Sequence, residues 1–110
     1  MNESKMTFLV LLSLSKVNPK VAKTVWDGLK KNVDPSAAPL WVDSHGAGIF
    51  ITTDLPAWKA WKTAGVQLSL DDWMDVKDLL VLQVGPDWYA RDNQTKPAAW
   101  MNARYPKPAY

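Results

Sequence analysis

Four aspartates gather in the second half of the chain, where their carboxylates could bind a divalent cation. They are Asp71, Asp72, Asp75 and Asp78. Hard cations bind where several oxygen ligands converge, and in a helix Asp71, Asp75 and Asp78 would share one side. The spacing lacks the turn glycine and late glutamate of a helix-loop-helix calcium loop. We expect solvated residues or helix caps, with no metal or cofactor; the alternative is an acidic patch for a basic protein surface.

An aromatic and basic group follows the second apolar run of the chain. It consists of Trp88, Tyr89 and Arg91. These residue types are enriched at the energetic centres of protein interfaces, and aromatic rings also stack on nucleic acid bases. They could instead cover an open sheet face together with Trp100 and Tyr105. We predict that Trp88, Tyr89 and Arg91 contact a macromolecule, with the four aspartates as a second patch.

A basic stripe lies on the first predicted helix. It contains Lys20, Lys23, Lys30 and Lys31. Such a stripe could follow the phosphates of a nucleic acid, in which case binding would weaken with added salt. An ordinary solvated helix face is the alternative. The net charge of +2 is too small to decide between them.

The single histidine, His45, could act as a general base. It follows Asp43 and Ser44 directly, however, whereas a nucleophilic triad needs groups that converge from different elements. Glycine follows it, so a hairpin turn is the simpler interpretation. The chain has no cysteine, which excludes thiolate nucleophiles and thiolate metal sites. We expect no catalysis.

The composition is that of one globular domain. The 110 residues are 47% hydrophobic and 22% charged, and we expect most of the seven tryptophans to fill the core. The absence of cysteine fits a reducing compartment, so a cytoplasmic protein is expected. Residues 6–15 resemble a short signal peptide. Glu3 and Lys16 beside them argue against this interpretation, and no stretch is long enough to span a membrane.

Two apolar runs, at residues 7–14 and 79–84, predict strands that are buried on both faces. Asn18 and Pro19 indicate the start of a helix after the first run. The apolar side of that helix contains Val21, Ala22, Val25, Trp26, Leu29 and Val33. Residues 40–42 and 49–53 predict a hairpin with its turn at 44–48.

A second helix is predicted after the hairpin, with Thr53 or Asp54 as its cap and Pro56 in its first turn. Gly65 should end it. Residues 66–78 show no clear pattern. A short final helix is expected from 97 to 104, followed by a flexible tail at 106–110.

The predicted order is strand, helix, strand, strand, helix, strand, which is the ferredoxin-like βαββαβ pattern. We therefore predict a single α+β domain over residues 5–105. Its four-stranded antiparallel sheet should carry both helices on one face, with a short C-terminal helix added. The other face is left for a partner, a ligand or the C-terminal segment.

Three stretches of the chain resemble a small ferredoxin-fold family that includes the CRISPR adaptation nuclease, the VapD toxins, the SinR-like proteins and the GhoS antitoxin. Residues 8–15 resemble its opening strand and residues 48–54 its third strand. Residues 75–84, with Trp88 and a late tryptophan at Trp100, resemble a SinR-like ending. Nuclease members have an aspartate at the end of the first strand, where this chain reads Leu12-Ser13-Leu14-Ser15. The resemblance therefore implies a fold and a dimer, and transfers no catalytic residue.

Together these features favour a non-catalytic macromolecule-binding protein of the small antitoxin, immunity or inhibitor type. It would act through protein–protein contacts and form a homodimer through its sheet or edge strands, with no membrane association. The alternative is an RNA- or DNA-binding protein or a metal-dependent ribonuclease. In that case the lysines would contact phosphates and the aspartates would hold the metal.

Overall fold

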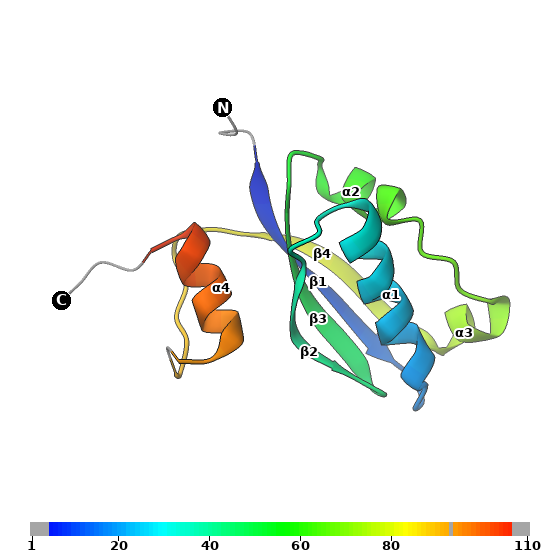
Figure 1. Cartoon of the computed structure of the whole chain (residues 1–110). Coiled ribbons are helices and arrows are strands. Elements are labelled where there is room, and N and C mark those ends of the chain that lie inside the picture. Colours follow the sequence, from blue (N-terminus) through cyan, green and yellow to red (C-terminus); the bar gives the residue numbers. More distant parts are fainter. Residues whose placement is uncertain (1–4, 93, 107–110) are drawn as a thin grey trace.

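The computed structural model describes residues 5–92 and 94–106 and is an α+β structure with one four-stranded antiparallel sheet (Figure 1). Its elements are β1 (Met6–Leu14), α1 (Pro19–Asn32), β2 (Ala38–Asp43), β3 (Gly46–Thr53), α2 (Ala57–Ala64), α3 (Leu70–Asp75), β4 (Val76–Val84) and α4 (Lys96–Arg104). Within the described residues, no helix is long and apolar enough to cross a membrane. Of the predicted tail, residues 107–110 lie outside the described part.

The strand order is β2-β3-β1-β4, and each neighbouring pair is antiparallel. The first apolar run thus forms a central strand, as predicted, because β1 is paired along both edges; the prediction that both its faces are buried is wrong, since Leu9 and Leu11 are only partly buried. Val10 and Leu12 are 1% and 3% exposed. They lie opposite Ile49 and Ala47 of β3 and form the middle of the core.

The first helix begins where the sequence predicts. The Asn18 side chain accepts a hydrogen bond of 3.1 Å from the backbone N–H of Lys20, and Pro19 occupies the first turn. The buried residues of α1 are Val21, Ala22, Val25 and Leu29. They pack on the same sheet face as Ile49 and Ile51, which leaves the lysines of α1 in solvent.

The second helix begins later than predicted. Thr53 is the last residue of β3, and neither Thr53 nor Asp54 caps the helix. The strand continues this far because it pairs with the start of β1, so α2 begins only after Pro56. Its end at Gly65 is confirmed, since the φ of 60° is one that glycine adopts without strain. The buried residues of α2 are Ala60 and Ala64.

The hairpin between β2 and β3 turns at Ser44 and His45. One carboxylate oxygen of Asp43 accepts hydrogen bonds from the backbone N–H groups of His45 and Gly46, at 2.8 and 3.1 Å. This is how aspartate commonly closes a turn. The prediction that His45 is a turn residue is therefore confirmed.

Residues 70–84 differ most from the prediction. A short helix, α3, lies there; Ser69 caps it, and Asp71 and Asp72 stand in its first turn, in agreement with their interpretation as residues of a helix start. β4 starts directly after it at Val76, three residues before the predicted strand, because pairing with the end of β1 extends it. The helix ends at Asp75, so the shared face that a helix over residues 71–78 would give to Asp71, Asp75 and Asp78 does not form.

Candidate functional site

The sheet face opposite α1 and α2 carries exposed apolar side chains. Neighbouring strand residues point to opposite faces, so β1 directs Leu9 and Leu11 away from the core. The strand register places Leu82 and Leu80 beside them. Leu80 and Leu82 are 53% and 45% exposed, and Trp41 of β2 is 40% exposed. A contiguous apolar strip of this kind commonly marks an interaction surface.

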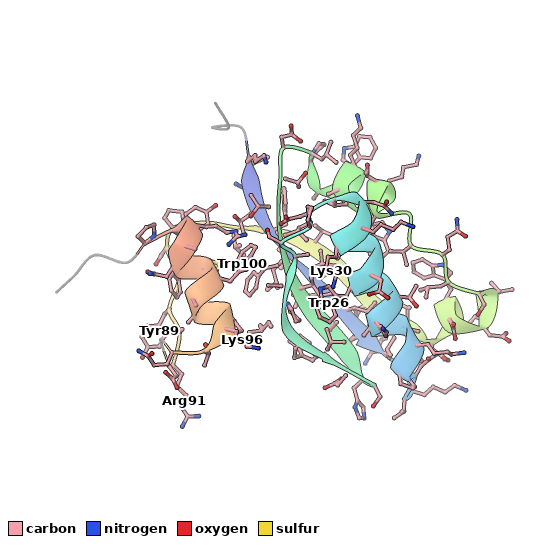
Figure 2. The ribbon with its side chains drawn as sticks, in the orientation of Figure 1. Trp26, Lys30, Tyr89, Arg91, Lys96 and Trp100 are labelled. Atoms are coloured by element: carbon pink, nitrogen blue, oxygen red, sulfur yellow. The ribbon has the colours of Figure 1, made fainter. Side chains whose placement is uncertain are left out.

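One end of this face is covered by α4. The indole of Trp100 stacks on Phe50 with 5.2 Å between ring centroids, and its Nε1 donates a 2.8 Å hydrogen bond to the carbonyl of Ser36. Figure 2 shows Trp100 pointing from α4 toward the sheet. Trp100 therefore covers the open face at this end, in agreement with the interpretation that aromatic residues cover this face. The strip of Leu80, Leu82 and Trp41 stays exposed.

Arg104 fixes α4 to two other parts of the chain. Its guanidinium donates hydrogen bonds to the hydroxyl of Thr52 at 3.0 Å and to that of Ser36 at 2.8 Å. It also lies 3.4 Å from the ring centroid of Trp100. Burial lowers the pKa of Arg104, and the nearby carboxylate of Asp34 opposes this effect. The helix is therefore anchored both to β3 and to the loop before β2.

A groove of about 1540 Å³ lies between α4, the segment that leads to it and the covered end of the open face. Its buried lining includes Phe50, Ala98 and Met101, while its exposed lining includes Asp87 and Arg91. An apolar interior with a few polar groups at the edge is typical of a binding site. We call it the C-terminal groove.

The predicted contact residues Trp88, Tyr89 and Arg91 all line the C-terminal groove, but in different ways. Trp88 is partly buried, and its Nε1 donates a 2.9 Å hydrogen bond to the carbonyl of Tyr105, which ties the two ends of the C-terminal segment together. Tyr89 is 91% exposed. Tyr89 and Arg91 lie at the outer end of this segment, away from α1 (Figure 2). The structure thus divides the group into one internal support and two exposed side chains.

The four predicted aspartates do not converge on one point. Asp72 and Asp75 both accept hydrogen bonds from the Asn18 side-chain amide, at 2.8 and 2.9 Å, and so join α3 to the start of α1. Asp78 accepts a hydrogen bond of 3.0 Å from Ser13 in the sheet, and Asp71 is exposed in the first turn of α3. Within residues 5–92 and 94–106, no group of three or more histidine, cysteine, aspartate or glutamate side chains could hold a metal ion.

The hydrogen bond from the Asn18 amide lowers the pKa of Asp72, and the charge of Lys20 and the hydroxyl of Ser69 act in the same direction. Partial burial of the carboxylate opposes them. The charged form of Asp72 is therefore favoured by the contacts that hold α3 against α1.

The lysine stripe is partly neutralised by the chain's own groups. Lys20 lies 3.7 Å from a carboxylate oxygen of Asp72, and Lys23 lies 3.9 Å from one of Asp27. The ammonium group of Lys30 lies 4.8 Å from the ring centroid of Trp26. The fourth lysine, Lys31, is exposed in the last turn of α1. α1, which carries the stripe, and α4, which borders the C-terminal groove, lie on opposite sides of the sheet (Figure 1).

Sequence reasoning missed the exposed leucines of β4. The run at residues 79–84 predicted a strand buried on both faces, whereas Leu80 and Leu82 lie in solvent at the edge of the sheet. No pattern within this run distinguishes an edge strand from a central one. The stack of Trp100 and Arg104 was also missed as an anchor, although their i, i+4 spacing places them on one helix face.

Comparison of the chain with family models, curated proteins and solved structures gives no match.

Proposed function

We propose that this chain is a non-catalytic protein that binds a segment of another protein in its C-terminal groove, in the manner of small antitoxin, immunity or inhibitor proteins. We also propose that its fold is a ferredoxin-like βαββαβ domain. The resemblance to the family named above is part of the same proposal.

The observation that carries the proposal is the exposure of Tyr89 and Arg91 beside an apolar groove. Tyr89 is 91% exposed. Neither side chain makes a hydrogen bond or ion pair with the described residues. Tyrosine and arginine contribute much binding energy when a partner buries them, and the groove offers an apolar side chain of that partner a largely apolar floor that includes Phe50 and Met101.

Charge favours a protein over a nucleic acid as the occupant. Asp87 and Asp92 line the groove beside Arg91, and their carboxylates would repel a phosphate backbone. Lys20 and Lys23 of the alternative site lie close to the chain's own carboxylates. A groove with both charge signs fits the mixed polar edge of a protein interface.

The test compares full-length variants as bait in extracts of the native host. The double variant Tyr89→Ala/Arg91→Glu changes the groove, and Trp58→Ala is the matched control because Trp58 is 66% exposed on α2. We expect a protein that the wild type and Trp58→Ala capture equally and that the double variant captures at least tenfold less. The purified pair should then show the same difference by calorimetry.

Two outcomes would contradict the proposal. One is capture that does not differ among the variants. The other is salt-dependent binding of labelled RNA or DNA that Lys23→Ala/Lys30→Ala weakens and the groove variant does not, which would favour the nucleic-acid alternative. RNA cleavage with Mg²⁺ or Mn²⁺ that is lost in Asp75→Asn would favour a ribonuclease.

A further inference from the structure

The sheet face opposite α1 and α2 continues beyond the end that α4 covers. The strand register arranges its side chains in rows that cross the sheet. The first row contains Phe50, Leu9 and Leu82, and the second row contains Trp41, Gly48, Leu11 and Leu80. Phe50 also lines the C-terminal groove, so the groove and these rows form one largely apolar surface.

The second row is hollowed. Gly48 has no side chain, and the ring of Trp41 packs against it. A hollow of about 180 Å³ lies among Leu11, Trp41 and Leu80. Leu80 is 53% exposed. An apolar hollow within an exposed surface is where a binding partner inserts an anchoring side chain.

The far end of this face, away from α4, is acidic. A third row contains Asp43, Gly46, Ser13 and Asp78. Both aspartates are exposed, and within residues 5–92 and 94–106 neither of them forms an ion pair, not even Asp78 with the preceding Lys77. The hydrogen bond that Asp78 accepts from Ser13 leaves its negative charge in place. A cationic side chain of a partner is therefore favoured at this end.

α4 indicates which kind of element this face accepts. It is a helix of the chain itself, and it lies on the same face with Trp100 stacked on Phe50 of the first row. Helices commonly cover the faces of sheets. From Leu82 to Asp78, β4 is about 13 Å long at the usual rise of a strand, and about nine residues of helix have the same length. A short helix therefore matches the exposed part of the face beside α4.

We propose that the partner protein of the C-terminal groove also places a short amphipathic helix on this face, beside α4. Apolar side chains of the helix contact Trp41, Leu80 and Leu82, and one of them enters the hollow. A lysine or arginine of the helix lies at Asp78. Such a helix has apolar residues at positions i, i+3 or i+4, and i+7. The inference rests on the proposed function, because it names the segment that the same partner supplies next to the groove.

The first test selects random peptides displayed on phage, with the full chain as the target and Leu80→Glu for counter-selection. We expect peptides with this helical spacing of apolar residues and with a lysine or arginine at one end. They should bind the wild type and Trp58→Ala equally and Leu80→Glu at least tenfold more weakly. Leu80→Glu should keep the circular dichroism of the wild type, and Leu82→Glu, also at an exposed position, serves as a second variant. A selection without peptides that depend on Leu80 or Leu82 would overturn the inference.

The second test measures charge complementarity by calorimetry with one selected peptide. Asp78→Lys should weaken binding at least fivefold, and a peptide with its basic residue changed to glutamate should bind Asp78→Lys more tightly than the wild type. Asp27→Lys, on α1 at the other face of the sheet, is the control and should leave both affinities unchanged. The peptide should also gain helical circular dichroism when it binds. Equal affinities for Asp78→Lys and the wild type, or a bound peptide that is not helical, would contradict the proposed helix.

The groove variant Tyr89→Ala/Arg91→Glu separates this inference from the groove function. Peptides that depend on Leu80 should bind this variant as tightly as the wild type. If the selected peptides depend on Tyr89 and Arg91 but not on Leu80, the groove function stands and the helix site on the sheet is wrong. A wild-type mass in solution of twice 12.3 kDa that Leu80→Glu reduces to one chain would make a second copy the occupant and would also overturn the inference.

Discussion

Arg104 joins three parts of the chain that are distant in sequence or structure. It donates hydrogen bonds to Thr52 in β3 and to Ser36 before β2, and it packs on Trp100 of its own helix. The planar guanidinium suits this role because it offers several donors at fixed angles and a flat face for stacking. The position of α4, and with it the C-terminal groove, depends on this side chain.

We expect Arg104→Ala to lower the free energy of unfolding by about 2 kcal/mol, since it removes charge-assisted hydrogen bonds. Amides of α4 should exchange with solvent faster than those of α1 in this variant. Arg104→Lys should recover little, because an ammonium group lacks the planar fork. Urea unfolding and hydrogen exchange measure both effects. The control Arg91→Ala should stay within about 0.5 kcal/mol of wild type; an equal loss in both variants would argue against the anchor.

Asp72 gives a prediction for pH. Its pKa in the folded protein lies below the usual value of 3.8, so the folded state stabilises the charged form. This contribution is fully present above the unfolded pKa and is lost as the pH falls through the folded pKa. Asp72→Asn should therefore melt at a lower temperature than wild type at pH 7, and the difference should shrink below pH 4. A difference independent of pH would mean that packing, and not charge, is responsible.

At the scale of the elements, β3 approaches its neighbours closely through two glycines. A Cβ on Gly46 would meet the backbone carbonyl of Leu12 in β1, whereas one on Gly48 would meet the ring of Trp41. Backbone in a central strand cannot move without disturbing the sheet. The half-exposed Trp41 side chain at the edge can turn away.

We therefore expect Gly46→Ala to cost about 2 kcal/mol or more of unfolding free energy, in the range of an overpacked core. Gly48→Ala should cost about 1 kcal/mol or less, because a side chain yields there. Urea unfolding of the two variants side by side measures the difference. Equal costs would show that β1 and β3 can separate more easily than the register suggests.

For the whole molecule, the arrangement separates surfaces with different chemistry. α1 lies on one side of the sheet and α4, which borders the C-terminal groove, lies on the other (Figure 1). A variant in the groove should therefore leave the lysine stripe of α1 unchanged, so the protein-binding proposal and its nucleic-acid alternative can be tested separately.

Most elements could be predicted where the signal is local. The Asn18 cap, the apolar side of α1 and the stop at Gly65 depend on residues within a few positions of each other, and the structure confirms them. The predicted start of α2 was too early, because pairing with β1 extends β3 to Thr53. The predicted start of β4 was three residues too late for a similar reason, since pairing with Leu14 brings Val76 into the strand.

The candidate site was predictable only in part. The types of Tyr89 and Arg91 indicated a binding role, and both prove to be exposed at the groove. The aspartates looked like one cluster in the sequence, but strand formation after Asp75 sends Asp78 to the sheet and leaves Asp72 to bind Asn18.

Composition, hydrophobic periodicity and capping residues were sufficient to establish an α+β chain with a buried opening strand, because these signals act over one or two turns of the backbone. Whether an apolar strand lies inside the sheet or at its edge depends on residues dozens of positions away. The runs at 7–14 and 79–84 look alike as sequence, yet β1 has a strand on each side and β4 has one. Leu80 and Leu82 are exposed because they point to the sheet face without α1 and α2, whereas Leu79 and Val81 of the same strand pack against the core. The packing of α4 formed the groove.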